Sequence, residues 1–144
     1  MQTKYDVYLG GAITGRSPLA VTVERTKAKE LCKKYNVRYY DPAEHEFVGI
    51  GKTVDVRPTR KRLKWYIPRD KKAVKESKFF LNITGDTLSS GTGWEMGWAK
   101  DYKRHIVLVA PEMANGEITN FTTVLVDKIC YTTEDAIKYI ARRT

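Results

Sequence analysis

Long apolar runs are missing from this sequence. No apolar stretch approaches the roughly 18 residues that a membrane-spanning helix needs. The N-terminal residues, Met1 to Asp6, also lack the apolar segment of a signal peptide. We therefore expect a cytoplasmic protein that makes no contact with a membrane.

Cysteine is scarce as well. Cys32 and Cys130 are the only two cysteines, and they lie far apart with no CxxC pair and no histidine at ligand spacing. Isolated cysteines of this kind are ordinarily buried, reduced thiols. We predict no zinc or other metal site, and no residue pattern calls for a cofactor.

Internal repeats and low-complexity stretches do not occur either. A chain of 144 residues has the usual size of one domain and is long enough to bury a core without disulfides. We therefore predict a single domain that spans residues 1–144.

Acidic residues are outnumbered by basic ones. The 26 Lys and Arg against 17 Asp and Glu give a formal net charge of +9, and much of the excess lies in residues 57–64 and 69–72, around Trp65 and Tyr66. Charge with aromatic stacking suits single-stranded nucleic acid, but no nucleic-acid-binding signature accompanies it, so specific binding is not expected. A solvated face and attraction of a phosphorylated small molecule are the alternatives. We expect a loop over the site that contains Arg57, Arg60, Lys61 and Arg62.

Strand and helix patterns alternate along the chain. Strand-like runs cover residues 6–11, 37–42, 79–83, 105–110 and 126–131. Helical spacing covers about 18–35, 64–78, a segment from Gly91 and a capped segment from Thr133, whereas 43–62 has no clear period. Strands separated by helices form right-handed crossovers. The sequence predicts an α/β fold, a doubly wound five-stranded parallel sheet with helices on both faces.

A glycine-rich stretch, residues 89–99, contains one carboxylate, Glu95. We expect Glu95 in the first turn of a helix, where backbone N–H groups would keep it ionised at neutral pH, as suits a nucleophile. The alternative is a capping box in which Glu95 bonds back to the Thr92 backbone. In a doubly wound sheet the ligand binds outside the carboxyl ends of the strands, where Gly10, Gly11 and Asp86 are also expected.

Three segments, taken together, resemble the nucleoside 2-deoxyribosyltransferase family in its small phage and bacterial form. They are Tyr8-Leu-Gly-Gly11, Arg69-Asp70 with the helix and strand that follow, and Ser90-Gly-Thr-Gly-Trp-Glu95-Met-Gly-Trp-Ala99. The similarity extends over nearly the whole chain in the same order. It implies a flavodoxin-like fold and cleavage of an N-glycosidic bond.

The resemblance also implies roles for individual residues. Glu95 matches the nucleophile that forms a covalent deoxyribosyl intermediate, and Asp70 matches an active-site aspartate suited to acid–base contact with the base. Ser89 stands where many members have an aspartate, so Asp86 is a third catalytic candidate. Asn120 is the best match to an asparagine supplied by a neighbouring subunit, which implies a homo-oligomer. The expected substrate-binding residues are Tyr8, Gly10, Gly11, Ser89, Ser90, Gly91 and Asn120.

Three functions remain open from the sequence. The first is transfer of deoxyribose between nucleobases, with deoxynucleosides and free bases as substrates. The second is hydrolysis of a 2'-deoxynucleoside 5'-monophosphate, because a 5'-phosphate would suit Arg16, Ser17 and the basic segment. The third is a non-catalytic module that binds nucleotides or nucleic acid.

Overall fold

The computed structural model of the protein describes residues 3–11, 17–45, 60–84, 90–110 and 124–144, with only the backbone described at 18, 60–63 and 90. All strand pairs in its five-stranded sheet are parallel, in the order β2-β1-β3-β4-β5. The strands are β1 (Tyr5–Gly10), β2 (Tyr39–Tyr40), β3 (Ser77–Asn82), β4 (His105–Val109) and β5 (Lys128–Cys130).

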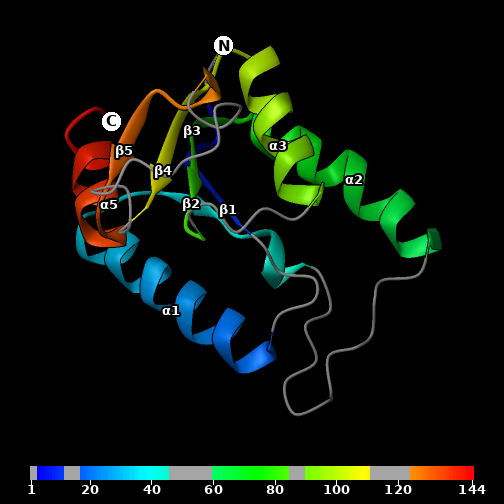
Figure 1. The fold of residues 1–144 in the computed structure, drawn as a ribbon, viewed down its shortest axis with the longest axis horizontal. Coiled ribbons are helices and arrows are strands. Elements are labelled where there is room, and N and C mark those ends of the chain that lie inside the picture. The colour runs from blue at the N-terminus through cyan, green and yellow to red at the C-terminus, as the bar shows by residue number, and fades with distance from the viewer. Residues whose placement is uncertain (1–2, 12–16, 46–59, 85–89, 111–123) are drawn as a thin grey trace.

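Helices cover both faces of this sheet (Figure 1). One face packs against α1 (Pro18–Lys34) and α5 (Thr133–Ala141), and the other against α2 (Arg60–Lys75) and α3 (Ser90–Asp101). A short 3-10 helix, η1 (Pro42–Glu44), follows β2. The predicted fold class, a doubly wound α/β sheet of flavodoxin-like order, is therefore confirmed.

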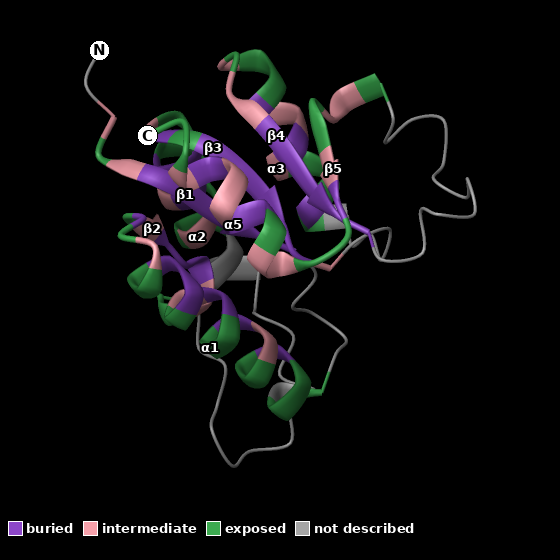
Figure 2. Ribbon diagram, turned by 90° about the vertical axis from the view of Figure 1, so that its left-hand side faces the viewer, coloured by how far each residue is buried: buried purple, intermediate pink, exposed green. Residues whose placement is uncertain are grey.

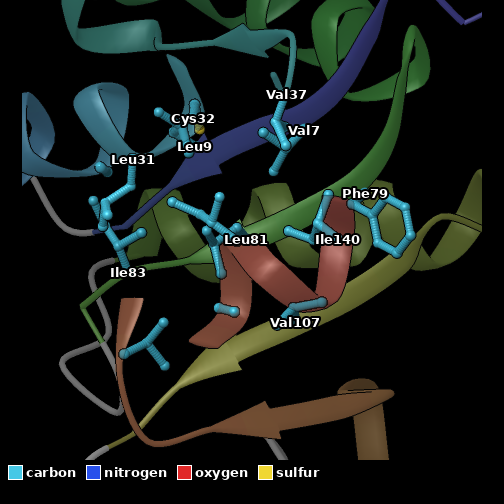
Figure 3. Packing of buried hydrophobic residues seen from close by; sticks show 14 of the residues in the cluster. Val7, Leu9, Leu31, Cys32, Val37, Phe79, Leu81, Ile83, Val107 and Ile140 are labelled. Carbon is cyan, nitrogen blue, oxygen red and sulfur yellow. The ribbon is translucent and has the colours of Figure 1, made fainter. Parts of the chain in front are cut away.

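Alternation along β1 separates two cores. Val7 and Leu9 point into the core under α1 and α5, whereas Tyr8 points into the core under α2 and α3. The strands are buried along most of their length (Figure 2), as expected for a parallel sheet covered on both faces. Figure 3 shows the aliphatic core beneath α1 and α5, with Val7, Leu9 and Leu81 at its centre.

The caps of α1 and α5 agree with the sequence patterns. The Ser17 hydroxyl accepts the Ala20 N–H at 3.4 Å, with Pro18 as the first helical residue. The Thr132 hydroxyl accepts the Asp135 N–H at 3.0 Å, so the predicted capped helix from Thr133 is confirmed. Among the described residues, no helix has the length and apolar character to span a membrane.

The expected loop over residues 43–62 is wrong at its end, because α2 already begins at Arg60. Arg60, Lys61 and Arg62 are thus helical, while Arg57 lies outside the described residues. Pro68 stands inside this helix. Pro68 and Lys64, whose carbonyl lacks the usual N–H donor, are both exposed, so water can replace that donor.

Two further boundaries differ from the sequence patterns. Helix α2 ends at Lys75 rather than 78, since Ser77 already pairs with Tyr5 across β3 and β1 and its hydroxyl donates to the Ala73 carbonyl at 2.7 Å. The strand predicted over 37–42 is reduced to β2. It stops there because the Asp41 carboxylate accepts the Ala43 N–H at 3.0 Å and begins η1.

The position expected for Glu95 is also wrong. Helix α3 begins at Ser90, so Glu95 is its sixth residue and lies in the second turn. Thr92 is inside the helix and buried, which excludes the capping box as well. The pattern failed because the helix extends through Gly91 and Gly93, two residues that favour loops.

Replacement of Gly10 by a larger residue should destabilise the fold. A Cβ there would lie 2.3 Å from Phe80 Cζ, and this ring is fully buried, so Gly10→Ala should lower the free energy of unfolding by about 1–3 kcal/mol. Gly93→Ala is the matched control, because a Cβ at Gly93 meets open space and alanine favours a helix by about 1 kcal/mol. Urea unfolding of both variants is the measurement. Equal stability of Gly10→Ala and the wild type would contradict the packing.

Candidate active site

Glu95 of α3 is the central carboxyl group of the candidate site. The residue as a whole is half-buried, but its Oε2 atom is fully buried and has no hydrogen-bond partner among the described residues. The Tyr8 hydroxyl of β1 and the charges of Asp70 and Arg25 act on the Glu95 carboxyl group. Side chains from three other elements therefore determine the state of this carboxyl group.

Burial raises the pKa of Glu95 to about 7, and the negative charge of Asp70 acts in the same direction. The Tyr8 hydroxyl and the Arg25 charge lower the pKa of Glu95 and oppose this shift only in part. The expectation that Glu95 stays ionised at neutral pH is therefore wrong. Its carboxyl lies beyond the N-terminal turn, where the free backbone N–H groups are, and it is removed from water.

Asp70 is the second carboxylate of the site. It is buried on α2, and its Oδ1 atom receives three hydrogen bonds. Arg69 donates from Nε at 3.4 Å and from Nη2 at 3.3 Å, and the Tyr40 hydroxyl donates at 3.5 Å. Oδ2 receives no hydrogen bond from the described part of the chain. Among the described residues, one carboxylate oxygen is thus anchored and the other is not.

Arg25 brings a buried positive charge to the same end of the sheet. Its Nη1 donates to Asp41 Oδ1 at 2.8 Å and to the Leu9 carbonyl at 2.7 Å, and its Nη2 donates to the Gly11 carbonyl at 3.2 Å. Lys29 adds a contact of 3.3 Å to Asp41 Oδ2. The guanidinium therefore hydrogen bonds to the carbonyls at the end of β1 and, through Asp41, links that strand to the end of β2.

The two glycines at the end of β1 are explained by packing against β3 and the residues that follow it. Gly10 lies against the Phe80 ring, and Gly11 has a φ of +139° with Thr84 where a side chain would be. Next to them, Asn82 donates to Met96 Sδ on α3 at 3.7 Å. Gly10 and Asn82 pair in register and help form the floor beneath α3.

The structure brings together part of the predicted site. Tyr8, Asp70 and Glu95 interact, and Gly10 and Gly11 lie beside them at the end of β1. Ser90 and Gly91 are the first two residues of α3. The remaining predicted site residues, Asp86, Ser89 and Asn120, lie outside the described residues.

Sequence reasoning missed Arg25 and Tyr40. Arg25 did carry a signal, because it occupies a position of the apolar helical period formed by Val21, Ala28 and Cys32, all of them buried. A basic residue at such a position needs a buried acidic partner. Tyr40 carried no signal, since aromatic residues are common in strands for reasons of packing alone.

The described residues contain no group of three or more His, Cys, Asp or Glu side chains placed to hold a metal ion. Both cysteines are buried and unbridged, as predicted. Burial raises the pKa of Cys32 to about 12, so its thiol stays protonated.

Comparisons with known proteins give structural likeness only. No protein-family model matches the chain, and no curated protein matches it in sequence. The fold is similar to a 2-deoxyribosyltransferase of Bacillus psychrosaccharolyticus, with a TM-score of 0.68, 19% identity, and coverage of 92% of this chain and 90% of that one.

Two other solved structures are similar over nearly their whole length. The CMP N-glycosidase BcmB of Clostridium botulinum has a TM-score of 0.58 and 15% identity, covering 96% of this chain and 98% of that one. The solution structure of BlsM has a TM-score of 0.67 and 20% identity, covering 96% and 93%. At these identities the likeness establishes a shared fold.

The raised pKa of Glu95 makes a prediction about stability. Between pH 4.5 and about 7 the folded chain holds a proton on Glu95 that the unfolded chain has lost, so this group makes folding less favourable as the pH rises. Glu95→Gln removes the effect. Its free energy of unfolding relative to the wild type should therefore increase from pH 4 to pH 8, by at most about 3 kcal/mol.

Glu134→Gln provides the contrast. Its hydrogen bond from Tyr35 lowers the pKa of Glu134, so this carboxylate stabilises the fold above its unfolded pKa and the contribution is lost as the pH falls. Glu134→Gln should thus lose stability relative to the wild type as the pH rises. Urea unfolding between pH 4 and pH 8 measures both trends. A Glu95→Gln difference that does not change with pH would show that Glu95 is not buried as described.

Proposed function

We propose that this protein cleaves the N-glycosidic bond of 2'-deoxyribonucleosides and transfers the deoxyribosyl group to another nucleobase, with Glu95 as the nucleophile. The observation that carries the proposal is the Glu95 carboxyl, buried with Oε2 unpartnered among the described residues and lying near a second carboxylate, Asp70. Burial of a carboxyl oxygen without a hydrogen-bond partner is costly for stability, and such costs concentrate at functional sites.

The two carboxyl groups are suited to a double displacement. Glu95 attacks C1' as a carboxylate, the C1'–N bond breaks, and its electron pair leaves with the base. The base takes up a proton, which Asp70 delivers. Near pH 7 Glu95 is about half protonated, so the resting pair can supply that proton through Asp70 as Glu95 becomes ionised. The incoming base returns a proton to Asp70, attacks C1' and releases Glu95.

Hydrolysis of a 2'-deoxynucleoside 5'-monophosphate is the second candidate. It is favoured by the likeness to the CMP N-glycosidase, which covers 96% of this chain. Water would then take the place of the incoming base at C1', and the same residues would act. A non-catalytic nucleotide-binding module, the third function left open by the sequence, predicts no release of base from either substrate.

Glu95→Ala should abolish both base release and base exchange while the chain stays folded. The assay incubates the protein with deoxyinosine and adenine, and separately with deoxynucleoside monophosphates, and follows free base and new nucleoside by chromatography. Glu134→Ala, an exchange of a partly exposed glutamate on α5, is the control and should keep full activity. Turnover by folded Glu95→Ala would rule out Glu95 as the nucleophile. New nucleoside identifies the transferase, and free base alone identifies the hydrolase.

We further propose that the active site is completed across subunits of a homo-oligomer by Asn120. Glu95→Ala and Asn120→Ala should each be inactive alone. When the two are mixed and subunits exchange, partial activity should return, because some sites then hold both intact residues. Sedimentation at the assay concentration gives the oligomeric state, and a fully active monomer would contradict the proposal.

A further inference from the structure

Stacked tyrosines on neighbouring strands reach both carboxyl groups of the candidate site. We propose that Tyr40 is a positioning residue for Asp70, and that the stack of Tyr8 on Tyr40 holds Asp70 and Glu95 in a set relation to each other. This inference rests on the proposed function, in which Asp70 protonates the departing base.

The stack runs across three strands on the face covered by α2 and α3. Tyr8 and Tyr40 pair in register between β1 and β2, and their ring centroids are 5.5 Å apart with planes at 20°. On one side Phe80 of β3 stacks on Tyr8 at 5.3 Å and 14°, and on the other His45 stacks on Tyr40 at 5.1 Å and 14°. Because neighbouring strands lie about 4.8 Å apart, the sheet itself sets the spacing of the rings.

Each tyrosine hydroxyl meets a different carboxyl group. The Tyr8 hydroxyl acts on Glu95 of α3 and lowers its pKa, and the Tyr40 hydroxyl donates to Asp70 Oδ1 on α2 at 3.5 Å. The second contact is long, as hydrogen bonds in resting active sites often are. The stacked tyrosines of the sheet therefore contact both helices that carry the reacting groups, α2 and α3.

Tyr40 fixes Asp70 relative to the sheet, which Arg69 alone cannot do. Arg69 is the chain neighbour of Asp70 on the same helix, so its hydrogen bonds move with that helix. Its Nη1 also donates to the His45 carbonyl at 3.2 Å. Tyr40 belongs to the sheet and is buried, and burial with the Asp70 charge raises its pKa to about 12. Its hydroxyl thus stays protonated and donates to Oδ1 of Asp70. This contact keeps the other oxygen, Oδ2, directed away from Tyr40.

Loss of the Tyr40 hydroxyl should impair protonation of the base and little else. Tyr40→Phe keeps the ring and its stacking. Two substrates separate the effects. Deoxyinosine needs a proton on its leaving base, whereas 7-methyl-2'-deoxyguanosine releases a neutral base without one. For deoxyinosine, Tyr40→Phe should lower kcat at least tenfold with KM within twofold. For the methylated nucleoside, kcat should change less than twofold.

Three further variants complete the experiment. Asp70→Asn should give the same substrate dependence with a larger loss. Tyr39→Phe is the control, since Tyr39 is the neighbouring residue of β2 and packs against the opposite core. Tyr8→Phe should instead move the acid limb of the kcat/KM profile to higher pH for both substrates, because the Tyr8 hydroxyl lowers the pKa of Glu95.

The outcomes distinguish this inference from the proposed function. If the wild type releases no base from either substrate, the proposed function is wrong. If the wild type is active and Asp70→Asn is slow, but Tyr40→Phe equals the wild type, the positioning role is overturned. Equal losses on both substrates would also overturn it, as general disturbance of packing. Urea unfolding checks folding, and Tyr40→Met provides a second hydroxyl-free variant with the same expected substrate dependence if Tyr40→Phe is unfolded.

Discussion

The guanidinium of Arg25 lies where α1 meets the carboxyl ends of β1 and β2. It pairs with Asp41 and donates hydrogen bonds to the carbonyls of Leu9 and Gly11. Removing one partner of a buried ion pair lowers the free energy of unfolding by about 3–5 kcal/mol. The carboxyl end of β1 therefore depends on this contact. The same charge acts on Glu95, which links the support of the strand ends to the chemistry above them.

Two carboxyl groups share the space above that support, and each meets a different set of neighbours. Asp70 receives three hydrogen bonds, two of them from a cation, whereas Glu95 is buried and its pKa is raised to about 7. The cost to stability is the Glu95 Oε2 atom, which is buried without a hydrogen-bond partner among the described residues.

Periodicity predicted the order of the elements because helix and strand repeats depend on local spacing. The alternation of Val7, Tyr8 and Leu9 already separates the two faces of β1, and Thr132 marks the start of α5. Boundaries were less predictable where local signals conflict with packing. Gly91 indicates a loop and Pro68 a helix end, yet both are helical, because packing on the sheet outweighs propensities of about 1–3 kcal/mol.

The sequence by itself determined the α/β order of elements, the glycine turn after β1, and the presence of Glu95 and Asp70 among the residues that resemble a known family. Only the tertiary structure decided that Glu95 is near half protonation at neutral pH and that Tyr40 meets Asp70. The reason is physical. A pKa depends on burial and on charges brought close from α1, β1 and α2, and no local spacing encodes those distances.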